Sequence, residues 1–263
     1  MTKFKLNFII KNFKHYLYFE SNKKNITNDL TKNYEFFLFY FYKESKSIVR
    51  RHRLYFSKNK RGYGEDAFSG MWDFIFKTYQ PINILEIGVY RGQTLSLFHI
   101  LSNLYKINSK IFGISPLNSS GDTVSNYIDI DYFDDLIKNF KFFNLKKPHI
   151  IREYSNSEEA KKFINSKKWD LIYIDGSHDY EVVSNDFKLS YENLNDNGLI
   201  VIDDSSLNLE YDKDYIEKKY QINSFKGHLG PSKVVSELIS NKKLRHLFGV
   251  GHNNVFIKDN SLN

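Results

Sequence analysis

From residue 81 onward the chain alternates short apolar runs with longer amphipathic stretches, and this alternation is its most constraining feature. Seven apolar runs predict strands over 82–87, 110–114, 149–152, 169–175, 198–202, 245–250 and 254–258. The stretches between them predict helices over 94–105, 132–143, 157–165, 180–194 and 231–240. Continuous apolar strands joined by helices indicate an α/β protein with a mostly parallel sheet covered on both faces. The last two strands have a short connection, which predicts an antiparallel pair.

One stretch falls outside the alternation. Residues 205–230 are polar and aromatic with two glycines, and we expect an inserted loop beside the carboxyl edge of the sheet. Ligands bind at that edge in folds of this kind.

The front of the chain differs from the rest in charge. Residues 1–62 hold 15 Lys and Arg against 4 Asp and Glu, whereas 63–263 hold 23 against 27. Helical spacing without Pro or Gly predicts helices over 4–20 and 27–47. We therefore expect a basic N-terminal helical extension over 1–62 and a main domain over 63–263.

A basic run, Arg50-Arg51-His52-Arg53, lies close to Tyr55 and Phe56. It is either a patch for phosphate, nucleic acid or an anionic membrane, or a solvated face on helices that cap the main domain. The second interpretation is favoured because charge runs are usually surface.

Composition excludes several classes of protein. The chain has no Cys, which excludes disulfides, a thiol nucleophile and a zinc-thiolate site. Residues 1–14 do not read as a secretory signal, and the aromatic run 36–42 is too short to span a bilayer. We expect a cytoplasmic protein without a transmembrane segment. The aromatic front helices could mediate self-association into a homo-oligomer or could be core.

The first predicted strand ends in the motif Glu86-x-Gly88-x-x-x-Gly92. Gly88 allows a tight turn, Gly92 allows close approach to a ligand, and the following helix directs its amino end at that ligand. This pattern is typical of the nucleoside-cofactor loop of class I S-adenosylmethionine-dependent methyltransferases. An ordinary strand-to-helix turn is the alternative. The three-glycine dinucleotide fingerprint is missing, which argues against an NAD-dependent oxidoreductase.

Acidic residues follow two strands that are expected to be neighbours. Asp175 ends the strand over 169–175, with His178 just beyond, and Asp203 and Asp204 follow the strand over 198–202. Clustered carboxylates are costly unless protonated or neutralised by a cation, and an all-oxygen site favours Mg²⁺, with Mn²⁺ or Ca²⁺ as alternatives. In the simpler interpretation, Asp203 or Asp204 caps a helix and His178 bonds to backbone.

Several blocks of the sequence together resemble a known family. The chain resembles class I methyltransferases linked to sugar and surface-glycan pathways, and more distantly the metal-dependent macrolide-sugar O-methyltransferases, such as the mycinamicin and macrocin enzymes. The resemblance covers about residues 60–258 and implies a Rossmann-like class I methyltransferase fold. It rests on the blocks over 61–66, 85–92, 113–122, 169–180, 198–206, 227–235 and 250–256.

The resemblance also implies roles for individual residues. Asp175, Asp203 and Asp204 would hold Mg²⁺ or Mn²⁺, and His178 would be the base, with Asp175 beside it as a second catalytic residue. The methyl donor, S-adenosylmethionine, would be bound by Glu86, Gly88, Tyr90, Gly92, Gln93, Thr94, Ser115, Asp122, Glu153, Ser155 and Asp175. Further candidates for the acceptor pocket, not taken from the resemblance, are Tyr63, Glu65, His228 and His252, and a structural role is the alternative for each of them.

One departure from the family concerns the tip of the second strand, which carries no acid to bind the ribose hydroxyls. Ser115 or Asp122 would then have to supply that contact.

The function expected from these residues is methyl transfer to a hydroxyl of a sugar or glycan precursor, assisted by a divalent metal. The acceptors left open are a nucleotide-linked sugar, a glycan end, a phosphate-containing capsule precursor and a small natural product. A nucleic-acid methyltransferase and a non-catalytic binding scaffold on the same fold are the alternatives. The basic front segment suggests nucleic acid, but the main body is mildly acidic, so nucleic acid is the less favoured partner.

Overall fold

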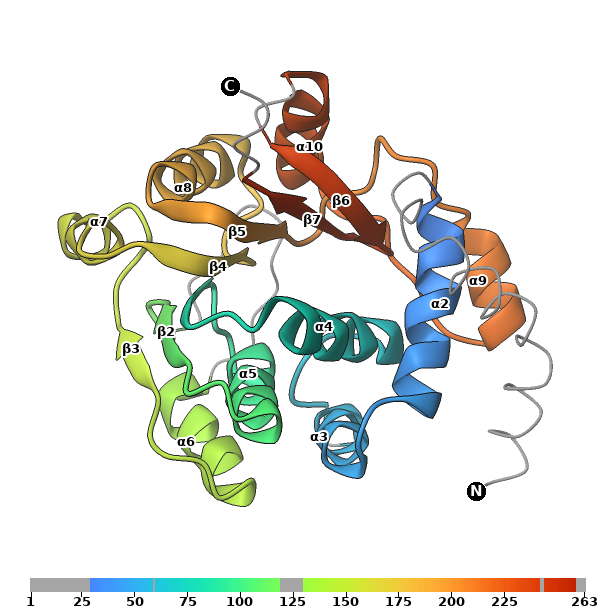
Figure 1. Cartoon of the computed structure of the whole chain (residues 1–263), viewed down its shortest axis with the longest axis horizontal. Helices are drawn as coiled ribbons and strands as arrows, with labels where there is room; N and C mark the ends of the chain where they lie inside the picture. The colour runs from blue at the N-terminus through green and yellow to red at the C-terminus, as the bar shows by residue number, and fades with distance from the viewer. Residues whose placement is uncertain (1–28, 59, 119–129, 242–243, 259–263) are drawn as a thin grey trace.

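A computed structural model describes residues 29–58, 60–118, 130–241 and 244–258 of the chain. Its centre is a seven-stranded sheet in the order β3-β2-β1-β4-β5-β7-β6 (Figure 1). The first five strands pair in parallel, and β7 runs antiparallel to both β5 and β6. The sheet is therefore mixed, and the predicted antiparallel pair is confirmed. The strands are β1 (Asn83–Ile87), β2 (Lys110–Ile114), β3 (His149–Ile151), β4 (Trp169–Ile174), β5 (Leu194–Ile202), β6 (Arg245–Val250) and β7 (Asn253–Ile257).

Nine helices lie within the described part of the chain. Figure 1 shows α8 and α10 on one side of the sheet and α4 and α5 on the other. The helices are α2 (Leu30–Lys43), α3 (Ser47–Lys58), α4 (Asp66–Tyr79), α5 (Gln93–Tyr105), α6 (Tyr132–Phe142), α7 (Glu158–Asn165), α8 (Tyr180–Glu192), α9 (Lys213–Tyr220) and α10 (Leu229–Asn241).

Helices cover both faces of the sheet. Because side chains alternate in direction along a strand, each strand contributes side chains to the core on either face. On β1, Ile84 packs into a core with α2, α4, α5 and α6, whereas Leu85 and Ile87 pack into a second core with α7, α8 and α10. Glu86 points to the same face as Ile84 and is 1% exposed. The predicted Rossmann-like architecture with helices on both faces is confirmed.

The front helices are part of the core. The helix predicted over 27–47 is α2, which ends at Lys43, and a second helix, α3, follows at Ser47. Ten of the fourteen residues of α2 are buried, among them Phe36, Phe37 and Phe41. Gly70 of α4 makes this close contact possible, because a Cβ there would lie 2.2 Å from the Phe37 carbonyl oxygen. The helix predicted over 4–20 lies outside the described residues.

Three helices were not predicted, namely α3, α4 and α9. The stretch 205–230, expected to be a loop, contains α9, whose first turn is capped by Asp212 accepting from the Tyr215 amide. Helix α4 is buried along most of its length, and it lies before residue 81, where the alternation of strands and helices used for the prediction begins. Among the described residues, no helix is both long and apolar enough to cross a membrane.

Candidate functional site

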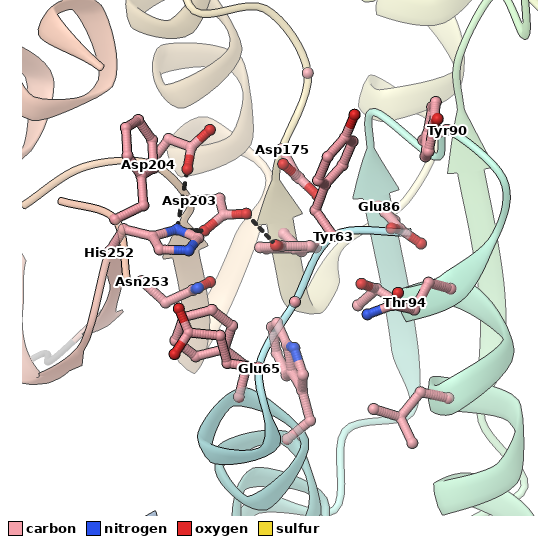
Figure 2. A pocket seen from close by; sticks show the side chains of 18 of the residues that line it. Tyr63, Glu65, Glu86, Tyr90, Thr94, Asp175, Asp203, Asp204, His252 and Asn253 are labelled. Atoms are coloured by element: carbon pink, nitrogen blue, oxygen red, sulfur yellow. Dashed lines mark hydrogen bonds and ion pairs between the residues drawn. The ribbon is translucent and has the colours of Figure 1, made fainter. Parts of the chain in front are cut away.

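Two adjoining cavities open at the carboxyl ends of the parallel strands. The larger has a volume of about 520 Å³ and the smaller about 260 Å³. Tyr90, Asp175 and Gly176 line both of them, so a molecule in one cavity can meet a molecule in the other at this wall. Figure 2 shows the larger cavity, with Glu86, Tyr90 and Thr94 on one side and Asp203, Asp204 and His252 on the other.

The turn after β1 forms one wall of the smaller cavity. Gly88 has a φ of +91°, and a Cβ there would lie 1.9 Å from the Asp175 carbonyl oxygen, so only glycine fits. Ser115, Glu153 and Ser155, the residues suggested by the sequence for the nucleoside end of a methyl donor, line the same cavity. The Ser155 hydroxyl donates to Asp186 Oδ2 at 3.0 Å.

The other residues predicted to bind the methyl donor do not all line the smaller cavity. Glu86, Gln93 and Thr94 line the larger cavity. Gly92 lines neither cavity; it has a φ of +77° and lies against Leu136 of α6, so its role is close packing of the turn. Asp122 lies outside the described residues.

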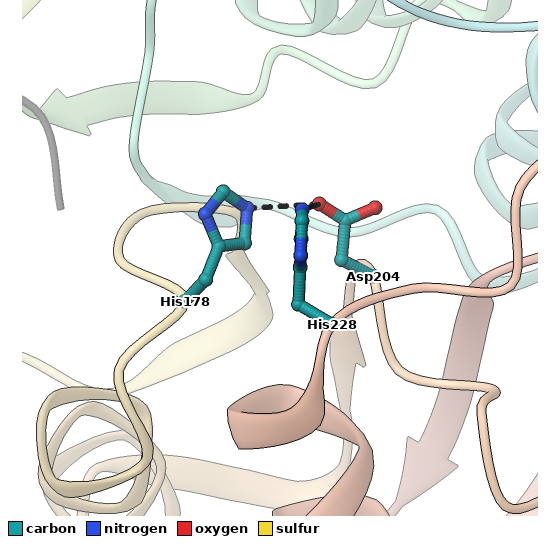
Figure 3. Close-up of side chains that lie close together, drawn as sticks. All are labelled: His178, Asp204 and His228. Carbon is teal, nitrogen blue, oxygen red and sulfur yellow. Dashed lines mark hydrogen bonds and ion pairs between the residues drawn. The ribbon is translucent and has the colours of Figure 1, made fainter. Parts of the chain in front are cut away.

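Asp203 and Asp204 share one histidine. His252 Nδ1 lies 2.7 Å from Asp203 Oδ1 and 3.0 Å from Asp204 Oδ1. The Tyr173 hydroxyl also donates to Asp203, at 2.8 Å. Asp204 Oδ2 lies 2.8 Å from His178 Nε2 and 3.9 Å from His228 Nε2 (Figure 3). The structure thus brings together His178, His228 and His252 around the carboxylates that follow β5.

Backbone contacts fix this cluster. The His228 amide donates to the Asp204 carbonyl at 2.8 Å. Gly227 has a φ of +117°, and a Cβ there would lie 2.2 Å from that same carbonyl oxygen. A Cβ on Gly230 would lie 2.1 Å from the His178 carbonyl oxygen, so α10 begins directly against the His178 backbone. The close packing of these segments explains the glycines of the block over 227–235.

Burial and mutual charge perturb the titration of the cluster. Burial raises the pKa of Asp175 well above its usual range, and the neighbouring carboxylates of Asp203 and Asp204 raise it further. Burial acts in the same direction on Asp204, but hydrogen bonds from His178 and His252 outweigh it and lower the pKa. For His252, burial favours the neutral ring, yet Asp203 and Asp204 outweigh burial and raise the pKa well above the usual value. We therefore expect Asp175 to hold its proton to a higher pH than an exposed aspartate, beside an ionised Asp204 and a His252 that favours its charged form.

Within the described part of the chain, two groups of side chains are close enough to hold a metal ion. Asp203, Asp204 and His252 form one, and His178, Asp204 and His228 form the other, with ligand atoms within 4.8 Å of one another in each. Asp203 and Asp204 are placed as the sequence predicted, but Asp175 belongs to neither group and instead hydrogen-bonds to Asp203. This donor set fits a divalent ion, and its imidazole nitrogens suit Mn²⁺ better than Mg²⁺.

The wall of the larger cavity is acidic and aromatic. Among the described residues that line it there is no Lys or Arg. Three lining side chains have a buried oxygen with no hydrogen-bond partner in the described structure: Glu86 Oε2, Gln93 Oε1 and Asn253 Oδ1. Each of these oxygens can accept a hydrogen bond. We therefore expect the molecule that occupies this cavity to supply O–H or N–H donors.

Tyr63 and Glu65 also line the larger cavity. Tyr63 is 81% exposed at its rim and lies 5.8 Å from the ring of Tyr90. Glu65 accepts a hydrogen bond from the Tyr34 hydroxyl of α2, so the front segment supports the cavity from behind. A Cβ on Gly62 or Gly64 would clash with the Gln93 side chain, which explains the glycines beside Tyr63.

Several lining residues were missed by the sequence analysis. Phe68 and Trp72 come from α4, which was not predicted, and Phe225 comes from the stretch expected to be a loop. Tyr173 lies within β4 and reads in the sequence as a core residue. The hydrogen bond from its hydroxyl to Asp203 depends on the pairing of β4 with β5, and the local sequence around Tyr173 does not predict that pairing.

Comparison with known proteins agrees with this geometry. Residues 85–205 match the family model described as a methyltransferase domain. Solved structures share the architecture across most of the chain: the SAH-bound Podospora anserina methyltransferase PaMTH1 aligns with a TM-score of 0.53 and 16% identity, covering 83% of this chain and 92% of that one. The chain has the fold of a class I methyltransferase.

Other relatives share this methyltransferase fold. A Bacillus cereus O-methyltransferase in complex with SAH aligns with a TM-score of 0.51 and 12% identity, covering 82% of this chain and 93% of that one. MycE, a methyltransferase of the mycinamycin biosynthetic pathway bound to Mg and SAH, aligns with a TM-score of 0.50 and 18% identity, covering 82% and 55%.

A curated relative, uncharacterized protein R132 of Acanthamoeba polyphaga mimivirus, is 32% identical over 127 residues, which are 47% of this chain. The match spans about half the length of that relative.

Proposed function

We propose that this protein transfers a methyl group from S-adenosylmethionine to a hydroxyl of an uncharged sugar or glycan end, with a divalent metal ion at Asp203 and Asp204. The observation that carries the proposal is the meeting of the two cavities at Asp175 and Tyr90. A donor bound in the smaller cavity and an acceptor bound in the larger one would meet at this wall. Alignment of the two reactants is a large part of catalysis in a displacement of this kind.

The residues of the smaller cavity and its margin fit the donor. Gly88, Ser115 and Glu153 offer a close backbone turn, a hydroxyl and a carboxylate for a nucleoside. Glu86 lines the larger cavity and keeps Oε2 without a hydrogen-bond partner, and such a buried acceptor suits the ammonium group of a donor that extends past the shared wall. Burial and the charge of Asp203 raise the pKa of Glu86 well above its usual range, so a cation would ionise it on binding.

The larger cavity favours an uncharged acceptor rich in hydroxyl groups. Its lining combines aromatic rings with oxygen acceptors and has no Lys or Arg to neutralise a phosphate. Aromatic faces with a few placed acceptors suit the apolar face and the hydroxyls of a sugar ring. Among the acceptors considered from the sequence, this supports a neutral sugar or glycan end over a phosphate-bearing precursor.

His178 is the proposed base. It would take the proton of the acceptor hydroxyl as the oxygen–methyl bond forms and the sulfur–methyl bond of the donor breaks. Asp204, 2.8 Å away, orients the imidazole and stabilises its charged form. A metal ion held by Asp203 and Asp204 would lower the pKa of the acceptor hydroxyl and fix its position. The proposed compartment is the cytoplasm, and a homo-oligomer stays a prediction.

The test is transfer of labelled methyl from S-adenosylmethionine to pairs of neutral glycosides and their phosphate esters, with Mn²⁺, Mg²⁺ or a chelator. We expect transfer to neutral glycosides only, with loss on chelation. His178→Gln is expected to lower kcat by about a hundredfold or more while S-adenosylhomocysteine still binds. Preference for the phosphate esters would overturn the acceptor class, and full activity of Asp203→Asn would overturn the metal proposal.

A further inference from the structure

Helices α3 and α6 together form one basic and apolar surface. On α3, Arg51, Leu54 and Lys58 follow one another at helical spacing, and all three are exposed. On α6, Lys138 and Phe142 lie four residues apart on one face, with Lys141 beside them, and all three are exposed. These six residues are called the α3–α6 surface below.

The two helices are joined at the centre of this surface. The ring of Tyr55 stacks on that of Phe142, with centroids 4.1 Å apart, and the Arg51 guanidinium lies 5.3 Å from the Phe142 ring centre. The Tyr55 hydroxyl donates to Asn139 Oδ1 at 2.9 Å. The α3–α6 surface is therefore one preformed face made by two helices that are distant in sequence.

The charge of this surface is of one sign. Helix α3 contains no acidic residue, and none of Arg51, Lys58, Lys138 and Lys141 forms an ion pair within the described residues. The nearest acid on the exposed side of α6 is Asp134, one turn before Lys138. Asp135 faces inward and is neutralised by Arg61 and Arg91. Unpaired cations held on a rigid face attract an anionic partner.

Two large apolar side chains stand among these cations. Leu54 is 52% exposed and Phe142 is 47% exposed. Apolar side chains surrounded by Lys and Arg fit the interface of an anionic bilayer, where the rings and methyl groups enter the headgroup region and the cations meet lipid phosphates. A nucleic acid would need open ring faces for base stacking, but Tyr55 covers one face of Phe142.

We propose that the α3–α6 surface docks the protein on an anionic lipid bilayer. The inference does not depend on the proposed reaction, since it rests on residues outside both cavities. Helix α3 ends at Lys58, only five residues before Tyr63 at the rim of the larger cavity. Docking through α3 therefore brings the segment that lines the cavity close to the bilayer, where a lipid-borne acceptor would be found.

The test is co-sedimentation of the full chain with vesicles of phosphatidylcholine alone and of equal parts phosphatidylcholine and phosphatidylglycerol. Binding to the anionic vesicles only, weakening with added salt, is expected. The triple variant Lys58→Glu, Lys138→Glu, Lys141→Glu should bind about a hundredfold more weakly, at roughly fivefold or more for each cation removed. Leu54→Gln should weaken binding without changing its salt dependence.

The matched control makes the same charge change elsewhere: Lys162→Glu, Lys188→Glu, Lys218→Glu, at exposed lysines on α7, α8 and α9. We expect this control to keep most of the vesicle binding, and both triple variants to bind S-adenosylhomocysteine like the parent protein. Equal loss in both variants, no loss in the α3–α6 variant, absence of vesicle binding, or tighter binding to RNA than to anionic vesicles would each overturn the proposal.

Discussion

At the scale of single residues, the buried carboxyl of Asp186, beside the smaller cavity, makes the stability of the fold depend on pH. It is 4% exposed, and burial raises its pKa to about 7 although Ser155 donates to it. In the unfolded chain an aspartate titrates near pH 4. Because the folded-state pKa is the higher one, the stability contributed by the neutral carboxyl is full below about pH 4 and is lost as the pH rises to about 7.

Replacing Asp186 by Asn should therefore raise the free energy of unfolding by about 2–4 kcal/mol at pH 8 and change it little at pH 4.5. Urea denaturation at the two pH values measures this difference. Asp196→Asn, which changes an exposed carboxylate, is the control and should shift neither value. A variant of Asp186 as unstable at pH 8 as the parent would mean that burial does not raise the pKa of this carboxyl.

Asp135 couples the donor turn to the segment beside the larger cavity. Its Oδ2 accepts from Arg91 Nε at 2.6 Å and its Oδ1 accepts from Arg61 at 2.5 Å. Burial works to raise the pKa of Asp135, but the two arginines outweigh burial and lower it. The ion pairs thus stabilise the fold above the unfolded-state pKa, near pH 4, and that contribution is lost as the pH falls further.

Asp135→Ala leaves two guanidinium groups without their partner and should lower the free energy of unfolding by about 3 kcal/mol. We also expect weaker binding of S-adenosylhomocysteine, since Arg91 belongs to the turn that contains Gly88. Asp134→Ala removes an exposed neighbouring carboxylate and serves as the control. Equal stability of the two variants would show that Asp135 has no coupling role.

At the scale of elements, the contact between α2 and α4 is what makes the front helices part of the core of the protein. Gly70 allows the two backbones to approach, so Gly70→Ala should lower the free energy of unfolding by about 1–3 kcal/mol through overpacking. Thermal unfolding measures the effect, and Thr78→Ala, at an exposed position of α4, is the control. An unchanged midpoint for Gly70→Ala would mean that α2 yields to the extra methyl group.

Strands were more predictable than helices for a physical reason. The strands of a sheet covered on both faces are continuous apolar runs, such as Leu171–Ile174. Such runs can be recognised in the sequence without any knowledge of the tertiary structure. Helix α4, which α2, α5 and the sheet enclose, lies before residue 81 and so outside the alternation of strands and helices on which the prediction relied. Helix α9 follows Asp212, a capping residue that a pass for apolar periodicity does not detect.

At the scale of the whole molecule, the residues that follow strands were predictable and their partners were not. Asp175, Asp203 and Asp204 could be placed at one edge because parallel strands end together. His228 and His252 were known only as candidates, because their contact with Asp204 depends on how α10 and the β6–β7 turn fold back over the sheet. The division into two cavities also depends on packing between distant segments.

The measurement that most directly tests the account is calorimetric titration of the protein with S-adenosylhomocysteine, with Mn²⁺ and then with a chelator. The parent protein and Asp203→Asn should both bind, because the smaller cavity is separate from the carboxylates that follow β5. Gly88→Val should not bind, since a side chain there meets the Asp175 backbone. Failure of the parent protein to bind under either condition would contradict the assignment of the smaller cavity to the methyl donor.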